Sequence, residues 1–157
     1  MTSPVTAAGA QALAERAAGA MWTGDRASQA LGIEIVAVAP GAATLAMVVR
    51  DDMVNGHGMA HGGFIFTLAD SAFAFACNST GETAVAAQCA ITFIRPGRRG
   101  DRLLATAREI SRSGRSGIYD VQVSVEGVVI AEFRGHSRTI GGSFITEPEA
   151  DAAHGQA

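Results

Sequence analysis

Residues 62–77 form an almost unbroken apolar run, GGFIFTLADSAFAFAC, which begins with two glycines and contains a single acid, Asp70. A helix that is apolar all round is a core helix, and an unpartnered carboxylate inside it costs on the order of several kcal/mol. The first N–H groups of such a helix have no intrahelical acceptor and carry the positive end of its dipole, so they suit a developing oxyanion. A carboxylate and an oxyanion site on one helix predict acyl-transfer chemistry. The alternative is an acid that reaches solvent at an interface or caps a loop.

The helical repeat limits how these two groups can cooperate. Gly63 and Asp70 are seven residues apart, which places them on nearly the same helix face but about 10.5 Å apart along the axis. One reacting carbon must lie within about 3–3.5 Å of its nucleophile and close to the oxyanion donors. One helix cannot meet both conditions, whereas two antiparallel copies can. We therefore expect an active site shared across a two-fold dimer interface.

Length and composition describe one ordinary globular domain. The chain has 157 residues, 48% of them hydrophobic and 17% charged, and its net charge of −3 argues against general nucleic-acid binding. We see neither a signal peptide nor the roughly 18 unbroken apolar residues of a membrane span, and we expect a cytoplasmic protein. Cys77 and Cys89 lie in apolar surroundings, which predicts reduced core residues in place of a disulfide.

The chain divides into three parts: an N-terminal helical segment (1–30), the main domain (31–141) and a mobile tail (142–157). Asp25 is a candidate cap for a short second helix in the first part. Alternating apolar residues around Pro40-Gly41 predict a β-hairpin. The order of hairpin, long helix and four antiparallel strands predicts an α+β domain with a curved sheet around a central helix. The expected helices cover 7–21 and 61–78, and the later strands 83–94, 102–111, 117–126 and 127–140.

Two polar residues precede the helix. Asn55, in a glycine-rich loop over 55–61, can orient a water or a substrate carbonyl, although Asn-Gly is also a common turn pair. His61, at the helix start, can do the same or simply cap the helix. The spacing of His57 and His61 allows metal binding, but no third ligand is evident, so we expect no metal.

Every basic residue is an arginine, and seven of the twelve fall between Arg95 and Arg115. The segments RPGRRGDR (95–102) and SRSGRSG (111–117) lie at opposite ends of one predicted strand. Arginine matches phosphate geometry, so either segment can bind part of an extended phosphate-bearing ligand. The alternative is a set of solvent-facing strand and turn residues.

Together these segments resemble the hotdog-fold acyl-CoA thioesterases, in particular the phenylacetate-degradation type called PaaI. The resemblance covers residues from about 30 to 141. It implies a sheet wrapped around the long helix, two subunits that form a double-width sheet, and dimers that commonly pair into tetramers. The matching segments are NGH (55–57), HGG (61–63), LAD with AFAFACNS (68–79), ITFIRPGRRGD (91–101) and RSGIYDV (115–121).

The resemblance also implies roles for single residues. The backbone N–H of Gly62, with Gly63, would polarise the thioester carbonyl. Asp70 of the partner subunit would be the general base for water or the nucleophile of a mixed anhydride, and both routes stay open. Asn55 and His61 would orient water and carbonyl. Related families carry a hydroxyl on the strand after the helix; here residues 84–87 read AVAA, so we assign none.

The implied substrate is an acyl-CoA, either phenylacetyl-CoA or hydroxyphenylacetyl-CoA, with no cofactor; a medium-chain acyl-CoA fits the same residues. Candidates for the acyl pocket are Phe64, Phe73 and Phe75, with core packing as the alternative. The residues expected to contact substrate are Gly63, Ser71, Arg95, Arg112 and Arg115.

Two other functions compete with hydrolysis. A non-catalytic module that only binds acyl-CoA would not need a buried acid such as Asp70. A hotdog dehydratase or hydratase would need a histidine paired with an acid on the helix, and the helix carries none beyond His61.

Overall fold

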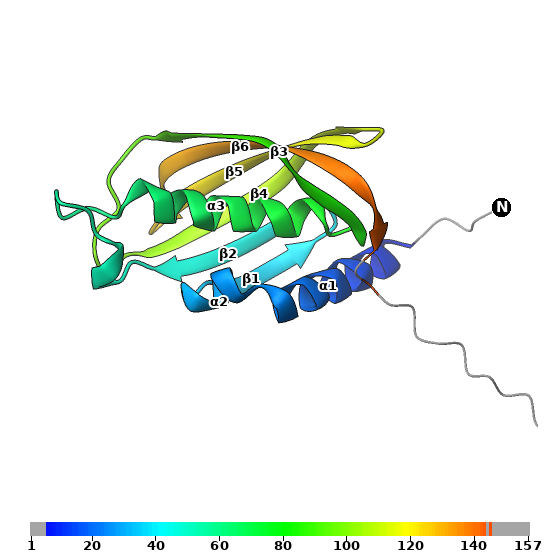
Figure 1. The fold of residues 1–157 in the computed structure, drawn as a ribbon, viewed down its shortest axis with the longest axis horizontal. Coiled ribbons are helices and arrows are strands. Elements are labelled where there is room, and N and C mark those ends of the chain that lie inside the picture. The colour runs from blue at the N-terminus through cyan, green and yellow to red at the C-terminus, as the bar shows by residue number, and fades with distance from the viewer. Residues whose placement is uncertain (1–5, 144, 146–157) are drawn as a thin grey trace, which may run out of the picture.

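Within residues 6–143 and residue 145, the part of the chain that the computed structural model describes, one antiparallel sheet of six strands curves around a long helix (Figure 1). The helices are α1 (Ala7–Gly24), α2 (Arg26–Ala30) and α3 (Gly62–Cys77), with a 3-10 turn at Asp51–Met53. The strands are β1 (Glu34–Ala39), β2 (Ala42–Val48), β3 (Glu82–Phe93), β4 (Arg102–Ser113), β5 (Ser116–Val125) and β6 (Val128–Ser143).

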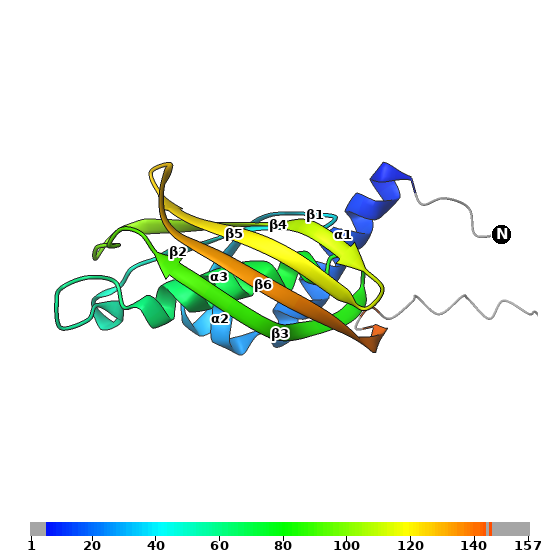
Figure 2. The same cartoon turned by 90° about the horizontal axis from the view of Figure 1, so that it is seen from above.

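The strand order in the sheet is β1-β2-β4-β5-β6-β3, and Figure 2 shows β5, β6 and β3 side by side from above. The strand that follows the central helix, β3, therefore pairs only with β6 among the described residues and forms one edge of the sheet. The β1–β2 hairpin turns at Gly41, whose φ of +72° is a conformation that glycine adopts without strain. An edge strand whose outer side has no partner is a natural place for another chain to pair.

The core lies between α3 and the concave face of the sheet. Leu68, Ala69 and Ala72 on the helix are completely buried. Phe73 packs edge-on against Tyr119, with ring centroids 5.5 Å apart. Facing it, Gly135 has no room for a side chain, since a Cβ there would lie 2.8 Å from the Phe73 ring. The helix and β6 therefore approach more closely than any larger residue would allow.

The N-terminal helices cover the edge of this core near β1. Ala14 and Ala17 of α1 are buried, and Trp22 reaches Phe75 of the central helix with ring centroids 6.2 Å apart. Asp25 caps α2 as predicted, accepting a hydrogen bond of 3.0 Å from the N–H of Ser28. Helices α1 and α2 therefore dock onto the main domain.

The structure confirms the α+β class and the wrapped central helix. The predicted helix 61–78 differs from α3 only by its caps, and the strand ends shift by a few residues, most in β6, which continues to Ser143. The predicted mobile tail lies outside the described residues except for 142, 143 and 145. No described helix has the length and apolarity needed to cross a membrane. The cytoplasmic location stays a prediction.

Candidate active site

The start of α3 presents one free backbone donor. The imidazole Nδ1 of His61 caps the helix by accepting a 3.0 Å hydrogen bond from the N–H of Gly63. The N–H of Gly62, by contrast, meets no acceptor within the described part of the chain. We predicted that both glycines would polarise a carbonyl; the structure leaves Gly62 available and engages Gly63. The capping alternative for His61 is the role observed.

A pocket of about 440 Å³ opens beside the Gly62 N–H. Besides Gly62 it is lined by two further predicted residues, Asn55 and Arg95, and is otherwise mainly apolar. The ring of Phe93 forms the wall against Gly62: a Cβ on that glycine would lie 2.8 Å from the ring, so a side chain there would have to displace the ring. The other lining residues are Met59, Ala60, Ile65, Ile94, Pro96 and Gly97.

Asn55 shapes the loop that borders this pocket. Its Oδ1 accepts hydrogen bonds from the N–H groups of His57, at 2.9 Å, and Met59, at 3.2 Å. This is the turn role that we kept as the alternative for Asn55. The side-chain NH₂ group has no acceptor among the residues described, and it remains able to donate to a water or a carbonyl.

Asp70 lies two turns further along α3, half-buried and next to β3. The thiol of Cys89 donates to its Oδ1 over 3.7 Å. Burial raises the pKa of the Asp70 carboxyl above its ordinary value, and the thiol contact lowers it by a smaller amount. Eight residues separate Gly62 from Asp70, a rise of about 12 Å along a helix, and Asp70 does not line the pocket. A single subunit therefore keeps the carboxylate and the free N–H apart.

The remaining predicted contact residues are spread over the molecule. Ser71 shares a 3.1 Å hydrogen bond with Ser28 of α2. Arg95 lines the pocket, and its Nη1 donates to the carbonyl of Val129.

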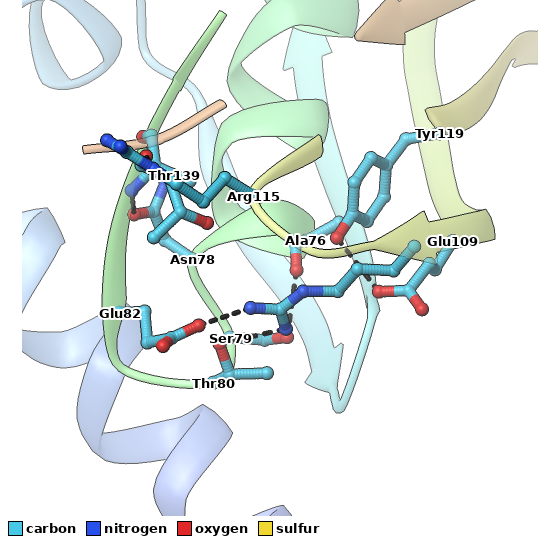
Figure 3. Close-up of polar contacts among 11 residues, drawn as sticks. Ala76, Asn78, Ser79, Thr80, Glu82, Glu109, Arg115, Tyr119 and Thr139 are labelled. Carbon is cyan, nitrogen blue, oxygen red and sulfur yellow. Dashed lines mark hydrogen bonds and ion pairs between the residues drawn. The ribbon is translucent and has the colours of Figure 1, made fainter. Parts of the chain in front are cut away.

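Arg112 and Arg115 lie near the other end of the central helix. Arg112 pairs with Glu82, and the Nε of Arg115 donates over 2.8 Å to the carbonyl of Thr139 (Figure 3). Within one subunit these two arginines are remote from the pocket. The sequence predicted this separation, because it placed the two arginine segments at opposite ends of one strand.

Polar groups near the C-terminal half of α3 have structural partners as well. Tyr119, 2% exposed, donates its hydroxyl to Oε2 of Glu109 over 2.8 Å (Figure 3). Asn78, at the C-terminal end of α3, bonds both the N–H and the carbonyl of Ala84. The hydrogen bonds of Asn78 fix the turn from the helix into β3.

Two of the three phenylalanine candidates for the acyl pocket are core residues. Phe73 and Phe75 are almost fully buried, and neither lines the pocket; Phe64 is half-buried and packs edge-on against His61. The aromatic residue of the pocket is Phe93. It lies in the matching segment 91–101, but sequence reasoning assigned it no role because only the fold brings the end of β3 to Gly62. In the described residues no three His, Cys, Asp or Glu side chains are grouped as metal ligands.

Comparison with known proteins gives consistent matches. Residues 57–131 match the model of the thioesterase superfamily. The acyl-coenzyme A thioesterase PaaI of Escherichia coli K12 is 46% identical over 129 residues, which cover 82% of this chain and 92% of that protein. The E. coli PaaI structure superposes with a TM-score of 0.83 at 44% identity, covering 85% of this chain and 97% of that one.

Two further structures are similar. A mutant of the phenylacetic acid degradation protein PaaI from Thermus thermophilus is 43% identical, with a TM-score of 0.72, covering 74% of this chain and all of that one (100%). The smu.793 protein of Streptococcus mutans UA159, solved bound to acetyl CoA, is 29% identical, with a TM-score of 0.68 and coverage of 71% and 90%.

Proposed function

Because the chain belongs to the hotdog-fold thioesterase superfamily, in its PaaI-type family, we propose that it hydrolyses acyl-CoA thioesters to a free acid and CoA. The observation that carries the proposal is that Gly62, whose N–H is free, lines a mainly apolar pocket at the positive end of a helix. A thioester carbonyl oxygen that accepts from this N–H gains most when it becomes an oxyanion.

The carboxylate comes from a second subunit in this proposal. The helix face that carries Gly63, Thr67, Asp70 and Ala74 is incompletely covered, and β3 beside it is an edge strand. Two copies that meet through this face with their helices antiparallel would place Asp70 of the partner subunit near the Gly62 N–H. These features support a dimer with two shared sites, and we propose that such dimers pair into tetramers.

Asp70 of the partner subunit then activates water as a general base, or attacks the thioester carbon to form a mixed anhydride that water opens. Both routes begin with the deprotonated carboxylate, and its raised pKa makes it a stronger base than a solvated aspartate. The Asn55 amide and the second imidazole nitrogen of His61 are available as donors to the water or the carbonyl. The thiolate of CoA is a reasonable leaving group, which lessens the need for a dedicated acid.

We propose phenylacetyl-CoA or hydroxyphenylacetyl-CoA as the substrate. The similarity to two PaaI proteins, both described by their part in phenylacetic acid degradation, supports an aromatic acyl group, and the smu.793 structure with acetyl CoA supports a CoA ester. The apolar pocket bounded by Phe93 is compatible with an aromatic ring. Arg95 lines the same pocket and is the arginine best placed to meet the CoA portion of a substrate there.

A thiol-release assay on aromatic and aliphatic acyl-CoAs tests the proposal. We expect the highest kcat/KM with phenylacetyl-type esters and a loss of about 10²-fold or more in kcat for Asp70→Asn, with acyl-CoA binding retained. Asp120→Asn is the matched control, because Asp120 pairs with Arg134 on the outer face of the sheet. Near-normal turnover in Asp70→Asn would refute the role of Asp70. Binding without turnover of any ester would instead identify a non-catalytic module.

A further inference from the structure

We propose that Cys89 is a positioning residue for the catalytic carboxylate: its thiol holds one oxygen of Asp70 and leaves the other to act on water. The inference rests on the proposed function, because it assigns the role of the residue that faces the proposed base. It also changes our view of Cys89, which the sequence presented only as a small core residue.

The two residues meet across the sheet edge and the helix. Cys89 lies on β3, opposite Gly135 of β6, and its Sγ is 3.7 Å from Oδ1 of Asp70. The other oxygen, Oδ2, has no hydrogen-bond donor in the described part of the chain. It is not closed off from solvent either, since no buried oxygen or nitrogen of a described side chain lacks a partner. One oxygen is therefore held while the other is open.

Cys89 has the protonation state that a donor needs. Burial, the charge of Asp70 and the hydrogen bond together raise the pKa of the Cys89 thiol to about 11. Only about 10⁻³ to 10⁻⁴ of it is therefore thiolate near neutral pH. Such a thiol is a poor nucleophile but a permanent donor, which favours positioning over covalent catalysis.

No other titratable side chain competes for this role. Burial and the Cys89 contact are the two causes that act on Asp70, and no arginine, histidine or acid from the described strands or from α1 and α2 perturbs it. On its own helix, Cys77 senses the charge of Asp70 but donates its thiol to the carbonyl of Ala74. A change at Cys89 should therefore be felt directly by Asp70, and a change at Cys77 should not.

Residues 84–87, where we sought a hydroxyl partner, lie earlier on β3, and Ala84 is engaged by Asn78. The side chain that reaches Asp70 comes two residues after this stretch. A thiol on β3 thus supplies the donor to Asp70 that the sequence did not reveal.

The test measures the Asp70 pKa directly, by ¹³C NMR of the aspartate carboxyl groups, with the signal assigned by its loss in Asp70→Asn. Three variants of the full-length protein are compared: Cys89→Ala, Cys89→Ser, and Cys77→Ala as a control that removes another thiol from the same region. Loss of the Cys89 donor should raise the Asp70 pKa in Cys89→Ala. Cys77→Ala should leave it at the wild-type value, and Cys89→Ser, which keeps a donor, should lie between wild type and Cys89→Ala or below wild type.

The same variants are then assayed for thioester hydrolysis across pH. In Cys89→Ala the acidic limb of kcat/KM should move to higher pH and kcat should fall roughly two- to tenfold, with KM unchanged. An unchanged Asp70 pKa in Cys89→Ala, an equal shift in Cys77→Ala, or no recovery in Cys89→Ser would overturn the inference. If Asp70→Asn remained active, the proposed role of Asp70 in hydrolysis would fail, while the NMR titration would still decide the Cys89 contact.

Discussion

Two variants that disable different halves of the proposed site should restore activity to each other within a dimer. Gly62→Pro removes the free N–H at the first position of α3, where proline suits a helix. Its ring would displace the Phe93 side chain, which is 51% exposed and can turn aside. Asp70→Asn removes the base. Alone, each variant should lose about 10²-fold or more in kcat.

The expected recovery follows from the helix geometry. Gly62 and Asp70 are about 12 Å apart along one helix, several times the reach of an aspartate side chain, so the proposed site combines Gly62 of one subunit with Asp70 of the other. Random mixing of the two variants makes half of the dimers mixed. Each mixed dimer has one intact site and one doubly defective site. The mixture should therefore show about one quarter of wild-type activity.

The assay is thiol release after the two chains are co-refolded, with mixed dimers counted by native mass spectrometry. The control carries both substitutions on one chain and is mixed with wild type. A shared site then gives about one quarter of wild-type activity, and a site within one subunit about one half. If mixed dimers form but the two single variants stay as inactive together as apart, the shared-site reasoning is wrong.

Two stability measurements probe the same helix. Burial raises the folded-state pKa of Asp70, so its charged form opposes folding and stability is lost as pH rises through that pKa. Asp70→Asn should therefore unfold at a higher temperature than wild type at pH 7, and this gain should disappear below about pH 4. An equal gain at both pH values would contradict the prediction. Asn78→Ala should lower the free energy of unfolding, measured in urea, by about 1–3 kcal/mol, because the N–H and carbonyl of Ala84 lose their partner. A change below about 0.5 kcal/mol would show that water replaces the amide.

Much of the fold was readable because it is encoded over short stretches of chain. The apolar run at 62–77, with His61 and Asn78 at its ends, predicted α3 almost to the residue. Asp25 was predicted to cap the short second helix from local sequence in the same way. Such signals depend on contacts three or four residues apart, which sequence spacing determines directly.

The site was predicted only as far as local reasoning extends. Helical spacing and the cost of a buried charge predict Asp70 and Gly62 as site residues and a second subunit to join them, and these stay predictions. The engagement of the Gly63 N–H by His61 is also local, but it depends on the cap conformation, which the sequence leaves open between capping and substrate contact.

The sequence by itself determined the central helix, the class of the sheet and the acid that the helix carries. Only the tertiary structure placed Phe93 against Gly62 and Cys89 against Asp70. These partners come from β3, and their positions depend on how that strand pairs with β6 and curves over the helix. Strand register and sheet curvature arise from the packing of the whole domain, so the pattern of neighbouring residues does not predict these two contacts.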